Sequence, residues 1–472
     1  MTTRRTPSST SATPPPAVAG NRDGLLLLAL SLGYFLVMLD TTIITVALPA
    51  IGDDLSGGLS SLQWVSNGYT VTFAALLLTA GALSDKFGGR RVFLIGLWSF
   101  AALSAISAAA TSMGMLIALR AVLGLAGALL VPTSLALIAN THADPSARAR
   151  ALGVWAALSG SGLVAGPIAG GLLTDAFGWR AIFVVNVPVA LVCVWITTRR
   201  APETARRPGR GIDLTGQVAA VVALGGLAFG LIQSGPLGWD DQQVLVALGL
   251  FVVGAVVFVA AERRPATENG GPVLPGGLFR GPVFAAGLVA GAVANFGLTG
   301  VLFVLSLSFQ DTHGFSPSVT GLALLPLTVP TAFNPILTGR LVARIGVRVP
   351  ATLGFVMMAV GTLAQVLFAG NSPGEVVIAV VGLLVLGFGV SFAIPSLLAA
   401  VVGSVPTELA GVGSGALNSA RQTGAVLGVA VLGALLSDGD AHTGGARFAL
   451  VVAGVVLLVG AAVVGTFLGR GS

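Results

Sequence analysis

The stretch LLLLALSLGYFLVMLDTTIITVALP, residues 25–49, decides the fold class. It is an apolar run long enough to cross a bilayer as one helix, which takes about 20 residues. Similar runs recur along the 472 residues, of which 55% are hydrophobic and 9% charged. A soluble globular chain carries about 25% charged residues. We therefore predict an all-α polytopic membrane protein, because the ~10-residue alternating segments of a membrane-spanning barrel are not visible in the sequence.

One acidic residue, Asp40, lies inside this apolar run. A carboxylate in the hydrocarbon region is energetically expensive, so an acid there is by default a hypothesis of function. The alternative is an acid near a helix end that reaches the headgroups, but roughly two helical turns of apolar sequence follow it before Pro49. We expect Asp40 to relay protons, couple an ion or neutralise a cationic ligand.

We predict fourteen spans, and the distribution of basic residues tests this count. Short cytoplasmic loops concentrate Lys and Arg. With the N-terminus in the cytoplasm, the outer segments hold only Arg180 and Arg447, and Arg120 and Arg421 fall inside spans. We therefore expect a multi-pass protein of the cell membrane with both termini cytoplasmic. The predicted spans are 25–48, 61–83, 91–111, 113–139, 150–174, 180–198, 213–234, 243–261, 282–309, 317–339, 349–369, 374–402, 408–436 and 446–468.

The sequence also argues against several classes of protein. Every predicted loop is short, and no P-loop pattern is present, so we expect no nucleotide-hydrolysing module and no enzyme. The single cysteine, Cys193, excludes an intrachain disulfide and a Cys-rich metal site. The net charge of +6 comes from residues in short loops between spans, so no nucleic-acid partner is expected. We expect neither a metal nor a cofactor, and an ion gradient as the energy source.

Two loops share a pattern that indicates an internal repeat. They read GALSDKFGGRR at 81–91 and GRLVARIGVR at 339–348, with glycines and basic residues at matching places. Two unrelated basic loops are the alternative, but transporter folds are often built from repeated halves. We predict a disordered cytoplasmic tail, two six-helix halves and two inserted helices between them; the boundaries are 1–22 for the tail, 23–200 and 266–472 for the halves, and 201–265 for the insertion.

Two arginines fall inside predicted spans. A buried Arg cannot lose its proton, so it needs a counter-charge or a wet cavity. Arg120 and Asp40 both lie about 10–12 Å below the outer face, at about 1.5 Å per residue, so the two can pair or share water. The alternative is that Arg120 extends to the outer headgroups. For Arg421 two interpretations stay open: binding an anionic or carbonyl-rich substrate, or holding a structural contact.

The most specific motif lies in the predicted fifth span, where small residues recur at i and i+4. Such spacing lets helix backbones approach closely, although a glycine-rich chain also produces it by generic packing. The proline of the motif removes a backbone donor and bends the helix. The motif consists of Gly162, Gly166, Pro167, Gly170 and Gly171.

These features resemble the major facilitator superfamily, in its fourteen-span drug:proton antiporter branch, over nearly everything after residue 22. The first-span signature Leu-Asp-x-Thr matches Leu39, Asp40 and Thr42. The resemblance implies that Asp40 and Arg120 couple protons and that the span-5 glycines are the antiporter motif of exporters. It also implies a gating loop on the cytoplasmic side, formed by Gly81, Asp85, Lys86, Gly88 and Arg90.

A drug-like ligand needs an apolar pocket with few polar groups. We expect this substrate cavity to be lined by residues on spans that can face the centre of the fold. The candidates are Phe35, Met38, Asn67, Tyr69, Trp155, Asn295, Phe296, Asn418 and Arg421.

The resemblance implies a proton-coupled exporter of lipophilic small molecules, an antibiotic or multidrug efflux pump similar to actinomycete antibiotic exporters. We expect it to act as a monomer. The alternative is a proton-coupled symporter that imports a small solute, against which the span-5 motif argues. A receptor or scaffold that does not transport needs neither a buried Asp and Arg nor two matched loops.

Overall fold

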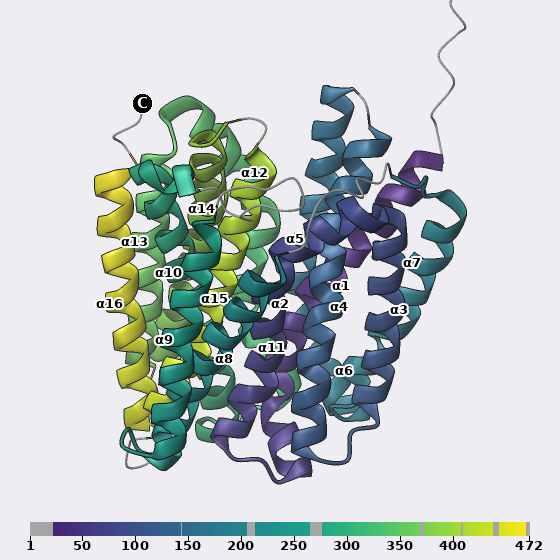
Figure 1. Ribbon diagram of the computed structural model, residues 1–472. Coiled ribbons are helices and arrows are strands. Elements are labelled where there is room, and N and C mark those ends of the chain that lie inside the picture. The colour runs from purple at the N-terminus through teal and green to yellow at the C-terminus, as the bar shows by residue number, and fades with distance from the viewer. Residues whose placement is uncertain are drawn as a thin grey trace, which may run out of the picture.

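The computed structural model describes residues 22–142, 144–204, 213–264, 276–368, 372–406, 409–437 and 443–468. Within these ranges the chain forms helices joined by turns, so the predicted all-α fold is confirmed (Figure 1). The predicted tail lies outside the described residues, except for Arg22, which begins the first helix.

The helices form an N-terminal group, an inserted pair and a C-terminal group. The N-terminal group contains α1 (Arg22–Leu55), α2 (Leu59–Phe87), α3 (Gly89–Ala108), α4 (Met113–Thr141), α5 (Pro145–Phe177), α6 (Ala181–Val184) and α7 (Asn186–Arg200). The inserted pair is α8 (Leu214–Leu237) and α9 (Gln242–Glu262). The C-terminal group contains α10 (Pro282–Leu307), α11 (Pro317–Ala323), α12 (Leu325–Ile345), α13 (Arg348–Ala364), α14 (Pro373–Gly403), α15 (Ala410–Ser437) and α16 (Thr443–Phe467), with short turns η1 (Gly276–Arg280), η2 (Ser308–Thr312) and η3 (Gln365–Leu367).

The predicted count of fourteen spans is not exactly confirmed. Among the described residues, 12 helices are long and apolar enough to cross a membrane, or 13 if the pair α11–α12, bent by 43°, is one span. Helix α2 does not meet the same test, because polar residues such as Gln63, Asn67 and Thr70 lower its hydropathy. It has 29 residues, however, and it connects α1 to α3, which are both long and apolar enough to cross a membrane.

Two of the predicted continuous spans are each formed by two helices. The predicted span 180–198 is formed by α6 and α7, with Val185 between them. The predicted span 317–339 divides at Leu324 into α11 and α12, and Pro326 follows that division directly. Proline has no backbone N–H to continue the helix, so the break falls where the residue type predicts one.

The two repeated loops make the same turn. Gly88 after α2 has φ +96°, and its counterpart Gly346 after α12 has φ +77°. Only glycine adopts this backbone region without strain, which explains why both loops carry it at the end of the helix. The division into two halves at the predicted boundaries stays a prediction.

Buried apolar residues form a separate core in each group and a third cluster where the groups meet. The N-terminal core includes Leu30, Phe93 and Phe100, and the C-terminal core includes Phe284 and Phe355. In the third cluster, apolar residues of α1, α4 and α6 pack against α10 and α15; examples are Ile44, Phe183, Phe303 and Val429. This third cluster lies toward the end of the bundle opposite the start of α1, which we call the far end.

Polar contacts also join the two groups at the far end, whereas their ribbons diverge at the other end (Figure 1). In each contact a side chain or backbone amide of one group donates to an oxygen of the other. The far end of the bundle is therefore closed. The bonds are Gln63 Nε2 to Val429 O at 2.9 Å and Ala430 O at 3.0 Å, Asn67 Nδ2 to Val426 O at 3.2 Å, Ser306 Oγ to Thr45 O at 2.8 Å, Gln310 Nε2 to Val46 O at 2.9 Å, and Ser318 N to Asp175 Oδ2 at 2.9 Å.

Candidate functional site

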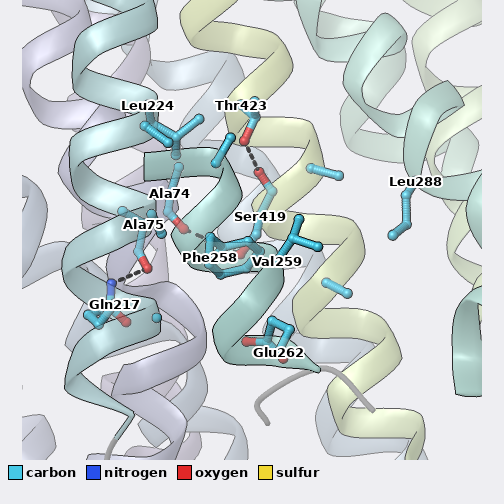
Figure 2. A pocket seen from close by; sticks show the side chains of 16 residues that line it. Ala74, Ala75, Gln217, Leu224, Phe258, Val259, Glu262, Leu288, Ser419 and Thr423 are labelled. Carbon is cyan, nitrogen blue, oxygen red and sulfur yellow. Dashed lines mark hydrogen bonds between the residues drawn. The ribbon is translucent and has the colours of Figure 1, made fainter. Parts of the chain in front are cut away.

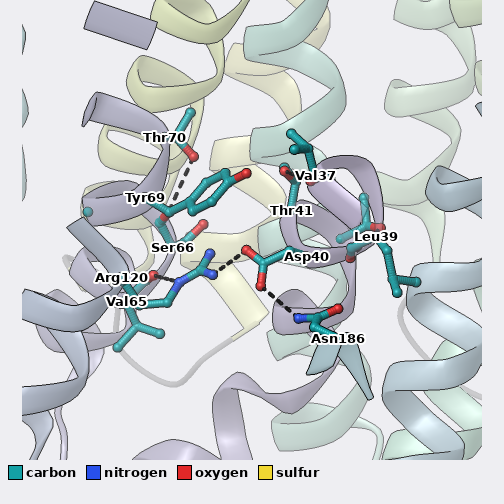
Figure 3. A network of polar contacts seen from close by, with 12 residues as sticks. Val37, Leu39, Asp40, Thr41, Val65, Ser66, Tyr69, Thr70, Arg120 and Asn186 are labelled. Atoms are coloured by element: carbon teal, nitrogen blue, oxygen red, sulfur yellow. Dashed lines mark hydrogen bonds and ion pairs between the residues drawn. The ribbon is translucent and has the colours of Figure 1, made fainter. Parts of the chain in front are cut away.

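Asp40 of α1 and Arg120 of α4 form an ion pair inside the N-terminal group (Figure 3). Each side chain is 1% exposed, so both charges are removed from solvent and from lipid. The two residues that the sequence placed at the same membrane depth are thus in direct contact. The alternative interpretation of each residue was that its side chain extends to the lipid headgroups. That interpretation is wrong for both, because neither side chain reaches the surface.

Two further helices hold the pair in place. Arg120 Nε donates to the carbonyl oxygen of Val65 in α2 at 3.0 Å, and its guanidinium lies 4.6 Å from the centroid of the Tyr69 ring. Asn186 at the start of α7 donates to Asp40 Oδ1 at 3.4 Å. The site therefore joins α1, α2, α4 and α7, and Figure 3 shows these side chains converging.

Not all hydrogen-bonding capacity at the pair is used. Arg120 Nη2 and Asn186 Oδ1 are buried and make no hydrogen bond to any residue that the structure describes. Buried polar groups are usually paired, and an unmet one costs roughly 1–3 kcal/mol. A donor and an acceptor with spare capacity beside a buried carboxylate suit a site where a proton arrives and leaves.

The glycines of the span-5 motif press α5 against α1 along the segment that carries Asp40. A Cβ on Gly162 would lie 2.8 Å from the carbonyl oxygen of Phe35, and one on Gly170 would lie 2.6 Å from that of Ile43. A Cβ on Gly166 would collide with Thr42. These glycines recur every four residues, so one face of α5 has direct contact with the α1 backbone.

Gly171 and Pro167 of the same motif face the other group of helices. A Cβ on Gly171 would collide with the carbonyl oxygen of Pro317 and lie 2.8 Å from Ser318 Cα, both at the start of α11. In the reverse direction, a Cβ on Gly321 would collide with the carbonyl oxygen of Pro167. The motif therefore has two faces, one inside the N-terminal group and one at the closed far end.

The predicted gating loop lies against the end of α7 in its own group. The backbone N–H of Gly89 donates to Thr204 Oγ1 at 2.6 Å, and Arg90 Nη2 donates to the Thr198 carbonyl at 2.6 Å. Asp85 and Lys86 lie in the last turn of α2, and Gly81 lies one to two turns before them. The gating role of these residues stays a prediction.

Candidates for the predicted cavity make contacts within each of the two groups. Arg421 donates through Nε to Asn295 Oδ1 and through Nη1 to Asn418 Oδ1, both at 3.1 Å. In the N-terminal group, Tyr34 of α1 stacks on Trp155 of α5 at 4.7 Å between ring centroids. Tyr34 was not among the residues predicted to line the substrate cavity, although Trp155 was.

The other cavity candidates pack in the helix bundle. Met38 and Phe296 are buried in the N-terminal and C-terminal cores, and Phe35 is half-buried against the third cluster. Tyr69 lies on Arg120, and Asn67 bonds to α15 at the far end. Their role in binding substrate stays a prediction.

The sequence reasoning missed one residue of the ion-pair site, Asn186. The stretch WRAIFVVNVP at 179–188, which contains it, resembles the start of the sixth span in the same family. That resemblance was the available signal. No group of three or more His, Cys, Asp or Glu that could hold a metal ion occurs within the described ranges.

Comparison with known proteins agrees with this architecture. The profile of the Major Facilitator Superfamily matches residues 30–429. The chain is 36% identical over 418 residues to the multidrug resistance protein Stp of Mycobacterium tuberculosis, covering 88% of this chain and 76% of Stp. It is 34% identical to the methylenomycin A resistance protein of Streptomyces coelicolor, covering 98% and 96% of the two chains, and 36% identical to the tetracenomycin C resistance and export protein of Streptomyces glaucescens, covering 92% and 79%.

The fold also matches solved structures. A bacterial homologue of the human lysosomal transporter Spinster superimposes with a TM-score of 0.69 over 96% of this chain and 98% of that one, at 18% identity. At that identity the likeness concerns the fold. The family profile, which covers most of the chain, and the resistance and export proteins, which align along nearly its whole length, lead to one conclusion. The chain belongs to the Major Facilitator Superfamily.

Proposed function

We propose that this protein exports lipophilic small molecules across the cell membrane in exchange for protons. The observation that carries the proposal is the buried Asp40–Arg120 ion pair, which is packed by the glycine motif of α5. The relatives named as resistance and export proteins support the direction of transport. Both termini are expected in the cytoplasm, because the short loops at that end carry nearly all the basic residues.

With this orientation the closed far end faces outward, and substrate enters from the cytoplasm. Helix α1 connects the proton site to the closure. Asp40 lies about one to two turns before Thr45 and Val46, whose carbonyl oxygens accept hydrogen bonds from Ser306 and Gln310 of the other group. Protonation of Asp40 removes its charge, weakens its attraction to Arg120 and lets α1 move. That movement shifts the balance between closed and open far ends.

The direct test is transport. Expression of the protein in a sensitive bacterium should lower the accumulation of a hydrophobic antibiotic, and a protonophore should restore it. Inside-out vesicles should take up the same compound when a proton gradient is imposed. If expression instead raises accumulation of a solute in a proton-dependent way, the symporter takes the place of the exporter.

We further propose that Arg421 binds an anionic or carbonyl group of the substrate. Its guanidinium is held by two neutral amides, and among the residues that the structure describes no carboxylate lies within 4.0 Å of it. Arg421→Ala should reduce export of carbonyl-bearing or acidic compounds by about tenfold, because a charge-assisted hydrogen bond contributes about 1.5–3 kcal/mol.

The control for Arg421 is a set of test compounds with and without such groups. Export of a compound that lacks them should change little in Arg421→Ala, and Arg421→Lys should recover part of the loss. An equal loss for every compound, together with a lower melting temperature, would assign Arg421 a structural contact instead.

We propose that the loop after α2 latches the two groups together when the cytoplasmic end closes. Asp85→Ala should then lower cross-linking between cysteines at Phe87 and Ala343 several-fold, measured in a Cys193→Ala background. Both positions are exposed and lie on the repeated loops, so a cross-link reports their approach. If cross-linking and transport are both unchanged, the loop does not act as a latch and only sets the orientation of the protein in the membrane.

A further inference from the structure

A cavity of about 300 Å³ lies away from the ion-pair site, between the inserted helices and the line where α2 meets α15 (Figure 2). Its walls come from five helices: α2, α8, α9, α10 and α15. They therefore include both groups and the insertion. All the wall residues lie in the half of the bundle nearer the start of α1.

The cavity exists because alanine makes up much of its walls. Ala220 and Ala223 of α8, Ala255 of α9, and Ala416 and Ala420 of α15 all line it. These short side chains do not fill the space between the helix backbones. An apolar space of this kind offers water no partners, and an empty one loses dispersion contacts. Inside a bilayer we therefore expect hydrocarbon to fill it.

The polar side chains of the described lining already have partners within the chain. Gln217 of α8 donates to a backbone carbonyl of α2, and Ser419 of α15 donates to the next one along, at 3.3 Å (Figure 2). Thr423 donates to a carbonyl of its own helix at 3.0 Å. Glu262 of α9 also has a partner within the chain, so no part of a ligand is assigned to it. The surface left for a ligand is apolar.

The cavity is elongated along the helices and reaches the lipid-facing surface. Its lining covers 216–224 on α8 and 255–262 on α9, which is about 10–12 Å at about 1.5 Å per residue. One leaflet of the hydrocarbon core is about 15 Å deep, so the cavity has the direction and length of an acyl chain in one leaflet. Val259 of α9 lines the cavity and is 46% exposed. Figure 2 shows Leu288 of α10 apart from it, so the opening to the bilayer lies between α9 and α10.

Two arginines lie directly beyond this lining, at the end of α9. Arg263 and Arg264 follow Glu262, and both are exposed. Their backbone amides bond to the carbonyls of Val259 and Ala261, so they continue the last turn of the helix. Arginine side chains at the end of a span extend to the headgroups, where the guanidinium binds a phosphate through two parallel hydrogen bonds. A slot for an acyl chain is thus followed by two cations at the level of the lipid phosphates.

We propose that this cavity holds a phospholipid, with one acyl chain between α8, α9 and α15 and its phosphate at Arg263 and Arg264. The inference goes beyond the proposed export and does not depend on it, because lipid binding is measured on purified protein without any gradient. The site is separate from the Asp40–Arg120 pair and from the cluster around Arg421.

The test uses two photoreactive lipids with the same acyl chains, each with a diazirine in the middle of one chain. One is a phosphatidylglycerol, and the other is a diacylglycerol, which has no phosphate. Each is added to delipidated protein in dodecyl maltoside micelles, and mass spectrometry locates the labelled residues. The phospholipid should label the cavity walls about tenfold more than the diacylglycerol, because each basic residue near a membrane surface favours an anionic lipid.

Two pairs of variants test the two parts of the site. Arg263→Gln with Arg264→Gln should lower phospholipid labelling to the level of the diacylglycerol. The same double change at Arg199 and Arg200, which end α7 away from the cavity, should leave it unaffected.

Ala255→Phe should fill the slot and lower labelling of the walls by both lipids several-fold. Val256→Phe, at the next position along α9, should change neither, because that side chain is 63% exposed. Ala220→Phe fills the slot from α8 and should repeat the loss, so the result does not depend on one variant folding correctly.

A free apolar molecule is the other possible occupant, and the phosphate distinguishes it from a phospholipid. Equal labelling by the two lipids, or full phospholipid labelling without Arg263 and Arg264, would mean that the slot accepts any apolar chain and would overturn the proposal. Labelling confined to lipid-facing positions such as Val256, or labelling of the walls that persists in both Ala255→Phe and Ala220→Phe, would contradict the slot itself.

Discussion

Asp40→Asn is expected to reduce proton-driven efflux to the level of cells without the protein, and Arg120→Ala to do the same. The amide of Asn does not titrate, so the variant has no group at this position that takes up and releases a proton. Each single change also leaves the other residue without its charged partner in a site that is 1% exposed. Breaking a buried pair in this way costs about 3–5 kcal/mol, so a lower melting temperature should accompany the loss.

The double variant Asp40→Asn with Arg120→Gln separates coupling from stability. It removes both charges, and a buried pair replaced as a whole is often close to neutral for stability. We expect it to recover most of the melting temperature and none of the efflux. Efflux that returns together with stability would mean that the pair serves the fold, and that protons are coupled elsewhere.

Gly171→Leu is expected to abolish export by preventing closure of the far end. Gly171 contacts the backbone at Pro317 and Ser318 of the other group, and a leucine side chain has no space there. Interfaces that depend on glycine do not accommodate a larger side chain. The altered helix remains packed on α1 through Gly162, Gly166 and Gly170, so insertion and the N-terminal core should stay intact.

A cysteine at Ser306 reports the state of the closure. Ser306 is buried where α10 bonds to α1. In a Cys193→Ala background, Ser306→Cys should react slowly with an impermeant thiol reagent added from outside, and several-fold faster when Gly171→Leu is also present. Unchanged reactivity and normal export would show that this contact does not control the closure.

Two other glycines of α5 complete the comparison. Gly160→Leu should export normally, because no heavy atom lies within 4 Å of a Cβ at that position. Gly166→Leu should also lose export, but for a different reason: its side chain collides with Thr42 and displaces the α1 segment that carries Asp40. It should therefore lower the melting temperature, whereas Gly171→Leu should not.

The sequence alone determined the class of protein, the positions of most helices and the pair that forms the candidate site. These features depend on quantities that are local to the chain. An apolar run of sufficient length forms a span wherever it occurs, and depth follows from counting residues at about 1.5 Å each. That is why Asp40 and Arg120, 80 residues apart, could be placed together before their contact was seen.

The tertiary structure decided the features that depend on how helices are rotated and packed. It placed Asn186 beside Asp40 and divided the glycine motif between two faces of α5. It also bent the span at Leu324, closed the far end and opened a cavity between the insertion and α15. Spacing along one helix tells which residues share a face, but not which neighbour that face meets. The neighbour is set by the simultaneous packing of helices distant in the sequence, and no single segment carries that information.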